Sequence, residues 1–535
     1  MLYDMLENFT NKSGSSNALL YMGKSFTYDE LFDGISEAAK RLSLLLNPGD
    51  VATVCMPNTP ECLYCFYALN KIGAVAHMVH PLAPLNQLKK FMAAANSKLL
   101  ITLSINLEKY APLGERYKIV YIHPARSLGA FARFVFDIKN KPYTGGTVGM
   151  IGYDRLPEGE DRRVMRADNS TGVYLHSGGT GGEPKIIELS DGAINSLASR
   201  GLEALQTDDA HGVHMLAALP ISHGFGLSMC IHTILTHGGV CVLMPKFDPK
   251  ASVKLIKKNR LHILVGVPAL FRALLARPEF YGDGLKNLYV GFVGGDSAPP
   301  ELLDEFNGRL IGAGARARLF EGYGLTETVN VCAVNTYANN RVGSLGRMLS
   351  GLEAKVIDPE TREVLPLGAE SKGEIVVCGN TLMNGYMKNP ELTAEAFIAI
   401  DGRRYVRTGD FGYIDADGYL YFVQRLKRII KIAGISIYPK EIEASATELD
   451  GVTDACAVEY KDGGGKTKIA LFYVGREYDA ARVREKIELD LSRYAVPTLV
   501  LNIDRIPVTP LMKADTLALA ARAQSICDGG SEATI

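Results

Sequence analysis

Residues 175–190 read Leu-His-Ser-Gly-Gly-Thr-Gly-Gly-Glu-Pro-Lys-Ile-Ile-Glu-Leu-Ser, with a Gly-rich segment between two short apolar runs. Glycine has no Cβ and adopts positive φ easily, so successive backbone N–H groups in such a segment can converge on anionic oxygens. The stretch therefore predicts a phosphate-binding loop, with a plain surface hairpin as the alternative. The expected ligands are Ser177, Gly178, Gly179, Thr180, Gly181, Gly182 and Lys185.

This loop differs from a Walker A motif, in which Gly-Lys-Ser/Thr opens a helix. Lys185 instead follows Pro184 and leads into Ile-Ile-Glu-Leu, an apolar and β-branched run. Such runs favour strands over helices. We therefore expect the loop to connect two strands.

Outward from the loop, the chain alternates helix-like and strand-like segments to about residue 293. Residues 27–42 carry an apolar 3–4 repeat behind a capping residue, and residues 51–55 are a short buried-type strand. This alternation predicts an α/β fold with largely parallel sheets. From about 341 to 424, short β-rich runs punctuated by Gly, Asp and Pro predict a small barrel or sheet, and an α+β pattern follows to about 520.

Composition limits the classes of function. A chain of 535 residues exceeds the usual size of one core, so at least two domains are expected. Lys and Arg number 58 against 59 Asp and Glu, which gives no reason to expect nucleic acid or an anionic membrane as a partner. The sequence lacks a signal-peptide pattern and any membrane-spanning apolar stretch, so a cytoplasmic protein is expected. Its nine irregularly spaced cysteines predict reduced thiols.

A second motif, Glu321-Gly-Tyr-Gly-Leu-Thr-Glu327, combines an aromatic ring, glycines, a hydroxyl and two carboxylates. Tyr323 is suited to stack on a purine and Thr326 to bond a phosphate oxygen. Glu327 is suited to hold Mg²⁺, which prefers carboxylate and phosphate oxygens. Taken alone, the segment is equally compatible with a Gly-rich turn at the start of a helix.

Three further positions are candidates. Asp410, in Arg407-Thr-Gly-Asp, places a carboxylate on a turn where it can accept both ribose hydroxyls; the alternative is a solvent turn. His223 follows a strand, where α/β sheets bind ligands, although a lone histidine is more often structural. Lys513 follows a Pro-rich turn and, taken alone, reads as solvated charge.

In order and approximate spacing, these motifs resemble those of the adenylate-forming superfamily, and within it an acyl-CoA synthetase. The segments that carry the resemblance are 56–61, 71–75, 177–185, 219–226, 294–299, 323–327, 407–410, 425–443 and 507–513. The resemblance implies a large N-terminal domain, 1–427, of two α/β subdomains plus a β-barrel at about 341–424. It also implies a small α+β C-terminal lid, 428–535, that rotates about a hinge at Arg428.

The resemblance further implies that a carboxylic acid attacks ATP to form an acyl-adenylate, and that coenzyme A then displaces AMP. The phosphate loop would embrace the phosphates, and Mg²⁺ would lie at Glu327. The resemblance also implies cofactor binding by Glu321, Gly322 and Tyr323, with Tyr323 stacked on adenine, and ribose binding by Asp410 and Arg425. Catalysis is implied for Lys513, Thr326 and His223, with Thr326 at the phosphate. Thiol access is implied for Lys431 and Gly434.

The chain departs from the family pattern at several positions. Gly178 and Gly181 stand where hydroxyl residues are common, Gln424 replaces a glycine, and Leu511-Met512 replaces Asn-Gly before Lys513. Two alternatives therefore stay open: an acyl-AMP ligase that loads a separate carrier protein, and a catalytically weakened nucleotide-binding relative.

The acid is only broadly defined by the sequence. Ser222-His223 stands where an amino-acid-activating enzyme would carry an acidic residue. This favours a plain carboxylic acid, aliphatic or aromatic, whose size is set by the pocket around His223, Gly295 and Gly322.

Overall fold

The structure is a computed structural model that describes all residues except 11–13, 141–142, 144, 147, 177–184, 206, 208, 433–434, 492, 510–513 and 530–535. It contains two compact units. The first comprises Met1–Ser177, Lys185–Ala354 and Val377–Val406, and the second comprises Lys355–Val376 and Arg407–Ile535. Within the described part of the chain, no helix is both long and apolar enough to cross a bilayer.

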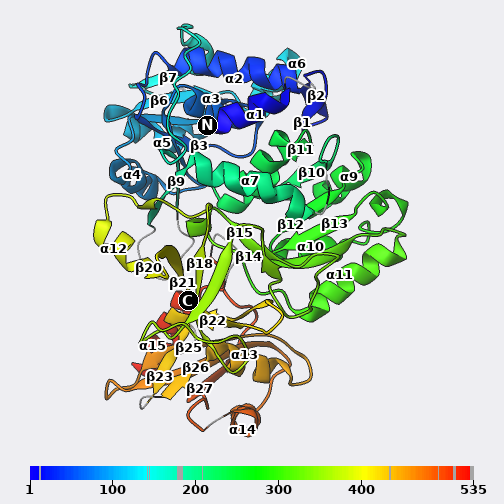
Figure 1. Cartoon of the computed structure of the whole chain (residues 1–535), viewed down its shortest axis with the longest axis vertical. Coiled ribbons are helices and arrows are strands. Elements are labelled where there is room, and N and C mark those ends of the chain that lie inside the picture. Colours follow the sequence, from blue (N-terminus) through cyan, green and yellow to red (C-terminus); the bar gives the residue numbers. More distant parts are fainter. Residues whose placement is uncertain are drawn as a thin grey trace. The chain divides into compact units, whose positions relative to one another are not determined.

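A nine-stranded sheet lies in the first unit (Figure 1). Its inner strands, β14 to β1, run parallel, and antiparallel strands close both edges. The order is β16 (Arg347–Met348), β15 (Val331–Val334), β14 (Arg318–Gly324), β13 (Val290–Val293), β12 (Ile263–Gly266), β10 (His214–Ala217), β11 (Val240–Leu243), β1 (Asn17–Tyr21) and β2 (Lys24–Thr27).

An eight-stranded sheet is the other main layer of this unit. Strands β8 to β7 are parallel, whereas β9 and β19 are added antiparallel at one edge. The predicted strand after Lys185 is confirmed as β9. The order is β19 (Gly385–Tyr386), β9 (Ile186–Ser190), β8 (Thr171–His176), β4 (Val75–Met78), β3 (Val51–Cys55), β5 (Leu99–Leu103), β6 (Lys118–Ile122) and β7 (Met150–Gly152).

Helices cover these sheets, and local sequence sets their ends. Thr27 caps α2 in a capping box with Glu30, as the 3–4 repeat predicts. Phe271 and Phe306 are fully buried in the core beneath the later helices, with ring centroids 5.0 Å apart. The helices are α1 (Leu2–Thr10), α2 (Tyr28–Leu42), α3 (Pro60–Lys71), α4 (Leu85–Ala94), α5 (Leu107–Tyr110), α6 (Ala130–Lys139), α7 (Asp191–Leu205), α8 (Thr233–Thr236), α9 (Pro249–Lys258), α10 (Pro268–Leu275), α11 (Pro300–Gly312) and α12 (Pro390–Glu395).

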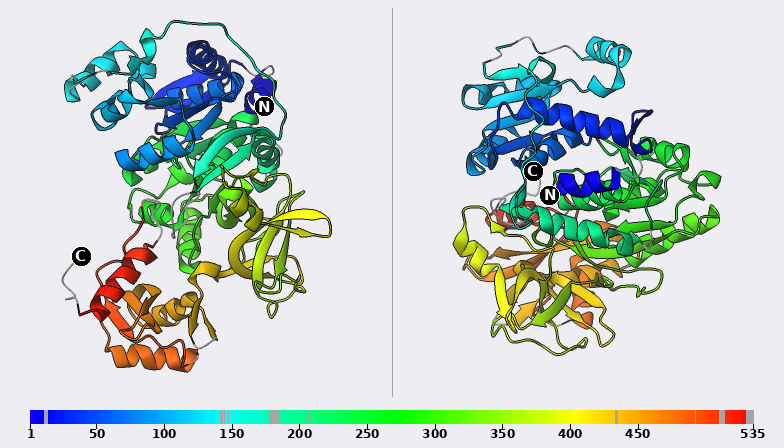
Figure 2. Two further views of the ribbon diagram at one scale, coloured as in Figure 1. Left: turned by 90° about the vertical axis from the view of Figure 1, so that its left-hand side faces the viewer. Right: turned by 45° about the horizontal axis from the view of Figure 1, so that its top comes forward.

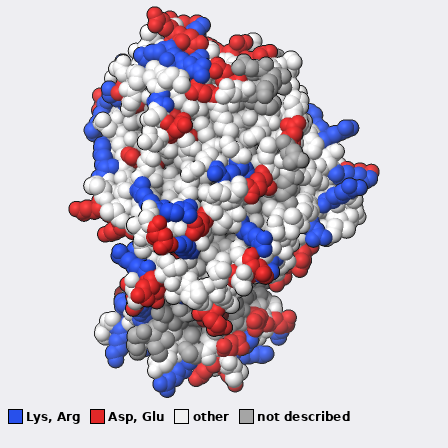
Figure 3. Space-filling view, in the orientation of Figure 1, with Lys and Arg blue, Asp and Glu red and all other residues white. Residues whose placement is uncertain are grey.

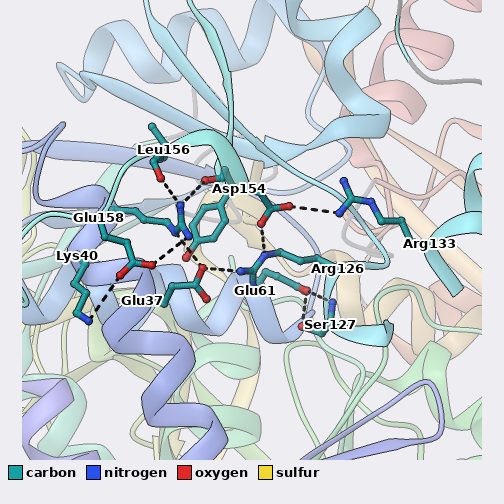
Figure 4. Close-up of polar contacts among 11 residues, drawn as sticks. Glu37, Lys40, Glu61, Arg126, Ser127, Arg133, Asp154, Leu156 and Glu158 are labelled. Carbon is teal, nitrogen blue, oxygen red and sulfur yellow. Dashed lines mark hydrogen bonds and ion pairs between the residues drawn. The ribbon is translucent and has the colours of Figure 1, made fainter. Parts of the chain in front are cut away.

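A polar network attaches the segment before α6 to α2 and α3 (Figure 4). The Arg126 guanidinium contacts Glu37 at 2.6 Å and Asp154 at 2.8 Å. Glu61, at the start of α3, accepts hydrogen bonds from the Ser127 backbone N–H at 2.9 Å and hydroxyl at 2.5 Å. The glutamate of the 56–61 motif therefore has a structural role.

The β-rich stretch folds as a five-stranded sheet in which β21 pairs antiparallel with β20 and β22. The hydrogen-bonded path is open, running from β17 to β20, with β22 beside β21. The strands are β17 (Glu353–Ile357), β18 (Gly373–Cys378), β21 (Arg403–Ile414), β20 (Phe397–Ile400) and β22 (Leu420–Arg425).

The C-terminal segment, orange to red in Figure 2, is the predicted α+β part. Its three-stranded sheet pairs β25 antiparallel and β27 parallel with β26, and two hydrophobic clusters line it. The elements are β23 (Ile430–Ile432), β24 (Ile435–Ile437), α13 (Pro439–Thr447), β25 (Val452–Lys461), β26 (Thr467–Gly475), α14 (Ala480–Asp490), β27 (Leu499–Asn502) and α15 (Thr516–Cys527).

Surface charge and thiols agree with the composition. Figure 3 shows acidic and basic side chains interspersed on the face it presents. Every cysteine is free, and only Cys527 is exposed. Cys62 and Cys65 lie on α3, where burial raises the pKa of both thiols, so they behave as core residues.

Candidate functional site

Tyr386 brings two of the predicted ionic groups together. Its ring centroid lies 4.7 Å from Nζ of Lys185, and its hydroxyl donates a hydrogen bond of 3.0 Å to Oε1 of Glu327. Both contacts lie within the first unit. The ring positions the lysine through a cation–π contact, and the hydroxyl fixes the orientation of the carboxylate.

Sheet pairing explains how Tyr386 reaches this position. Strand β19 pairs antiparallel with β9, and Tyr386 is opposite Ile187, two residues after Lys185. The Met383 N–H donates to the Glu327 carbonyl at 2.8 Å, which ties the segment before β19 to the turn that carries the carboxylate. The sequence reasoning missed Tyr386 because Asn-Gly-Tyr carries no chemical signature of its own.

The residues of 321–327 lie at the end of β14 and in the short 3₁₀ turn η7 (Thr326–Thr328). Tyr323 and Thr326 are buried, whereas Glu327 is half-buried. Among the described residues, the Glu327 carboxylate receives one hydrogen bond, from Tyr386. A half-buried carboxylate with remaining lone pairs fits Mg²⁺, so the donor chemistry is suitable for that ion.

Glu321 is a carboxylate of the candidate site with a clearly raised pKa. Burial raises its pKa from 4.5 to about 7, against the opposing effect of a hydrogen bond from the Gly343 backbone. Burial and the Glu327 carboxylate also raise the pKa of Tyr386. Perturbed groups of this kind are commoner at functional sites than elsewhere.

The turn after Glu327 is strained and tightly packed. Val329 is fully buried and has φ 64° and ψ −52°, a γ-turn conformation that a β-branched residue adopts only under constraint. A Cβ added to Gly224 would lie 2.1 Å from the Val329 carbonyl oxygen. The loop of His223 and the turn of Glu327 are therefore in close backbone contact.

Asn58 holds the loop that leads to His223. Its side-chain amide donates to the carbonyls of Ala217 at 2.9 Å and Leu219 at 2.8 Å. Its oxygen accepts from the Ile221 N–H at 2.9 Å. Asn58 belongs to the 56–61 motif, so that motif acts by positioning this loop.

In the second unit, Asp410 and Arg425 are cross-strand partners on β21 and β22. Arg425 Nε lies 2.9 Å from Oδ1 of Asp410, which is buried, whereas the arginine is exposed. Arg425 also donates to the Thr408 carbonyl at 3.1 Å. The structure thus brings together the two residues expected to hold the ribose.

Glu374 of β18 holds the part of β21 that contains Asp410, so this segment is a strand and not the predicted turn. Its carboxylate accepts two hydrogen bonds from Arg407, at 2.9 and 2.7 Å, and one from the Gly409 N–H, at 3.1 Å. Gly409 has φ 68°, which explains the glycine at this position. Sequence reasoning missed Glu374 because nothing in 373–378 marks it apart from strand alternation.

Arg428 and Lys431 lie beyond β22. Arg428 is paired with Glu443 at 2.5 Å and donates to the Ala457 carbonyl at 3.1 Å. Lys431 is exposed and contacts Glu360 at 3.1 Å. The remaining predicted positions lie outside the described residues: Ser177, Gly178, Gly179, Thr180, Gly181, Gly182, Gly434 and Lys513.

Comparison with known proteins identifies the family. The sequence pattern described as "AMP-binding enzyme" matches residues 6–387. The chain belongs to this family of AMP-binding enzymes. Among its relatives is indoleacetate–CoA ligase of Aromatoleum aromaticum, 31% identical over 424 residues, covering 76% of this chain and 79% of the relative. Another is 4-coumarate–CoA ligase 3 of Arabidopsis thaliana, 29% identical and covering 91% and 85%.

Solved structures confirm the fold of this AMP-binding enzyme. ATP-bound MatB from Rhodopseudomonas palustris superimposes with a TM-score of 0.81 at 23% identity, covering 98% of this chain and 99% of that one. MenE from Bacillus subtilis, in complex with ATP and magnesium ion, gives 0.77 at 22% identity, covering 96% and 98%. The resemblance to CoA synthetases and the predicted α/β class are therefore confirmed.

Proposed function

We propose that this chain is an AMP-forming acid–CoA ligase with two half-reactions. In the first, a carboxylate oxygen attacks the α-phosphorus of ATP and pyrophosphate leaves. In the second, the thiol of coenzyme A attacks the acyl carbon and AMP leaves. The family and the CoA ligase relatives support this reaction class.

One observation supports the assignment most strongly: Lys185 and Glu327 meet at Tyr386. The first half-reaction joins two anions, so the site must provide positive charge and a place for a divalent ion. Lys185 supplies a cation at the end of the phosphate loop, and Glu327 supplies an oxygen ligand. When bound there, Mg²⁺ would neutralise charge on the phosphate oxygens.

The other residues bind and orient the reactants. Thr326 would donate to a phosphate oxygen and Tyr323 would contact adenine. Asp410, with Arg425 beside it, would accept the ribose hydroxyls, because a carboxylate presents two acceptor oxygens. Lys513 would place its ammonium between the attacking carboxylate and the α-phosphate.

The second half-reaction requires a different set of residues at the acyl carbon. We propose that residues 428–535 rotate about Arg428, which removes Lys513 and admits the segment of Lys431 and Gly434. Arg428 lies in the turn η8 (Leu426–Arg428) between β22 and β23 and is anchored to Glu443 on α13. An Arg428→Pro change would restrict φ at this connection and impair the exchange between steps.

The acid is proposed to be a plain carboxylic acid, with an aromatic acid favoured. Phe225 Cε1 lies 3.6 Å from the position that a Cβ on Gly294 would occupy, so an aromatic ring two residues from His223 lies beside the 294–299 segment. The two relatives are named as ligases of indoleacetate and 4-coumarate, both acids with flat rings.

The test is pyrophosphate release with indole-3-acetate, 4-coumarate, benzoate, octanoate and acetate, followed by detection of the thioester with free coenzyme A. We expect acid-dependent release and thioester with at least one aromatic acid. Glu327→Gln should lower the rate at least tenfold, the effect of losing about 1.4 kcal/mol or more of transition-state stabilisation. The exposed Glu370→Gln variant serves as the control.

The two alternatives give distinct outcomes in the same assay. An acyl-AMP ligase that serves a carrier protein would release pyrophosphate without forming a thioester with free coenzyme A. A catalytically weakened relative would bind nucleotide and release no pyrophosphate with any acid. Either result would contradict the proposed reaction.

A further inference from the structure

A basic pocket of about 450 Å³ lies in the eight-stranded sheet where β5 and β6 begin. His176 is instead the last residue of β8, at the carboxyl end of that parallel strand, and the phosphate loop follows it in the sequence. Among its described lining residues are three cations, Lys98, Arg116 and Lys118, and no carboxylate. Lys98 also pairs with Asp50 at 2.7 Å.

Two buried hydroxyl-bearing residues also line this pocket. Ser97 is 6% exposed and Tyr117 is 8% exposed. The Tyr117 hydroxyl is fully buried and has no hydrogen-bond partner among the described residues. With no accessible surface, the Tyr117 hydroxyl does not reach a ligand in the pocket, which leaves Ser97 as the candidate donor.

A buried hydrogen-bond chain leads from Ser97 to the residue before the phosphate loop. The Ser97 and Thr53 hydroxyl oxygens lie 2.6 Å apart, and Thr53 Oγ1 is 2.9 Å from Nδ1 of His77. The Nε2 atoms of His77 and His176 are 2.8 Å apart. Phe91 of α4 stacks on the His176 ring, with centroids 3.8 Å apart.

The hydrogen bonds from Ser97 to His176 can all run in either of two directions. Burial lowers the pKa of His77 well below its usual value and that of His176 to about 4, so both rings are neutral at pH 7. A neutral imidazole has one donor and one acceptor nitrogen. If Ser97 donates to Thr53 and Thr53 to His77, then His77 donates to His176, whose Nδ1 carries the hydrogen.

In the opposite direction, the Ser97 hydroxyl is available to donate a hydrogen bond to a ligand. His77 then donates to Thr53, Thr53 donates to Ser97, and Ser97 donates outward to an acceptor. His176 now donates from Nε2 to His77, and its Nδ1 becomes an acceptor. In the structure, Nδ1 of His176 is buried without a partner among the described residues. No hydrogen bond at Nδ1 therefore decides whether this nitrogen carries the hydrogen.

We propose that this pocket binds a small phosphate-bearing ligand, and that the ligand, by accepting a hydrogen bond from the Ser97 hydroxyl, reverses the direction of the hydrogen bonds that lead to His176. The three cations supply the charge that an oxyanion requires, and the Ser97 hydroxyl supplies a donor. Because His176 immediately precedes Ser177, the reversal changes the group presented beside the phosphate loop. That last consequence rests on the proposed function, whereas the binding and the reversal do not.

Binding is tested by calorimetric titration with inorganic phosphate, in a Lys185→Ala background that weakens the candidate catalytic site. We expect a Kd that is raised at least tenfold by the double change Arg116→Glu and Lys118→Glu. The variant Lys89→Glu, an exposed lysine on α4 outside the pocket lining, should bind as the background does. Equal affinity in all three proteins, or no binding to any, would overturn the site.

A second arm separates the sources of the phosphate group. Vesicles that contain phosphatidic acid are compared with free phosphate by co-sedimentation. Sedimentation that the double variant abolishes assigns the pocket to a lipid headgroup, and titration without sedimentation assigns it to a free ligand. Both outcomes support the shared chemistry, whereas sedimentation that the double variant leaves unchanged contradicts the headgroup source.

The reversal is tested by NMR of protein with ¹⁵N-labelled histidine imidazoles, in which long-range couplings distinguish the two tautomers. Saturating phosphate should move His176 from the Nδ1–H to the Nε2–H form, with the assignment checked by His176→Asn. Ser97→Ala should leave phosphate bound but abolish the tautomer change, and Thr53→Val provides a second break in the chain. An unchanged His176 tautomer in the phosphate-bound protein would refute the proposed reversal.

Discussion

A single side chain, Tyr386, connects the cation of one predicted motif with the carboxylate of another. The connection is chemically asymmetric: the ring face holds Lys185, and the hydroxyl holds Glu327. The two contacts can therefore be removed separately. Residue-level tests can then show which of them the first half-reaction needs.

Tyr386→Phe should weaken the apparent affinity for Mg²⁺ in pyrophosphate release and leave the Lys185 contact in place. A hydrogen bond to a charged group contributes about 1.5–3 kcal/mol, so the Mg²⁺ concentration at half-maximal rate should rise about tenfold or more. Tyr386→Leu, which also removes the ring that contacts Lys185, should lower the rate of pyrophosphate release further. The control is Tyr413→Phe, whose ring stacks on Tyr421 in the second unit. If this Mg²⁺ concentration were unchanged in Tyr386→Phe, the result would contradict Glu327 as a ligand of the metal.

Glu321 should make stability depend on pH. Because burial raises its pKa from 4.5 to about 7, the folded chain binds more protons at this group than the unfolded chain between those values. Stability therefore falls as pH rises through this window, by on the order of 3 kcal/mol at this residue. The apparent melting temperature of Glu321→Gln should fall less between pH 5 and pH 8 than that of the wild type. Parallel pH profiles, with Glu370→Gln as the exposed control, would contradict this pKa.

At the scale of elements, the conformation of β21 around Asp410 depends on a neighbouring strand. Glu374 on β18 faces three donors from Arg407 and Gly409. The carboxylate is 2% exposed, so its substitution cannot be compensated by water. The segment of Asp410 therefore depends on the pairing of β18 with β21.

Glu374→Gln should lower both stability and nucleotide affinity. The amide keeps the shape of the carboxylate but replaces one acceptor oxygen with an NH₂ donor. At least one of the three N–H groups of Arg407 and Gly409 would then face a donor and lose its hydrogen bond. Breaking such a buried arrangement costs on the order of 2 kcal/mol or more, so we expect a melting temperature several degrees lower and a raised KM for ATP. Asp450→Asn, which removes the exposed pair with Arg476, should change neither. A wild-type melting temperature in Glu374→Gln would contradict the role of Glu374.

The sequence predicted elements better than it predicted their partners. The Thr27 cap and the strand after Lys185 follow from local patterns, because caps and β-branched runs act within a few residues. The association of Asp410 with Arg425 was implied only by the family resemblance. Tyr386 and Glu374 were missed because their roles arise from sheet pairing. Pairing brings together residues about 200 positions apart at β19 and β9, and no local pattern encodes it.

At the scale of the whole molecule, the proposal divides the two half-reactions between two arrangements of the chain. Lys513 and Gly434 lie outside the described residues, and their roles stay predictions. The boundary near Arg428 is likewise a prediction. Arg428 anchors to Glu443 and the Ala457 carbonyl, both within the second unit.

Lys513→Ala should separate the half-reactions. A charged donor aimed at a transition state contributes about 3–4 kcal/mol, so adenylate formation should slow by roughly a hundredfold or more. Conversion of supplied acyl-AMP to thioester should be affected much less, because the lysine has left by that step. Both rates are measured separately, with Lys466→Ala as an exposed control in the same unit. Equal losses in both half-reactions would refute the division of labour.

The buried thiols become reactive only where the native protein unfolds, so their alkylation reports local unfolding. A brief pulse of an alkylating reagent should modify Cys527 alone in the folded protein, and each additional adduct marks a segment that has come apart. Cys456 reports on the sheet of the second unit, whereas Cys55, Cys230 and Cys332 report on the first. Mass spectrometry of the adducts would therefore rank the unfolding order of the two units without any engineered label.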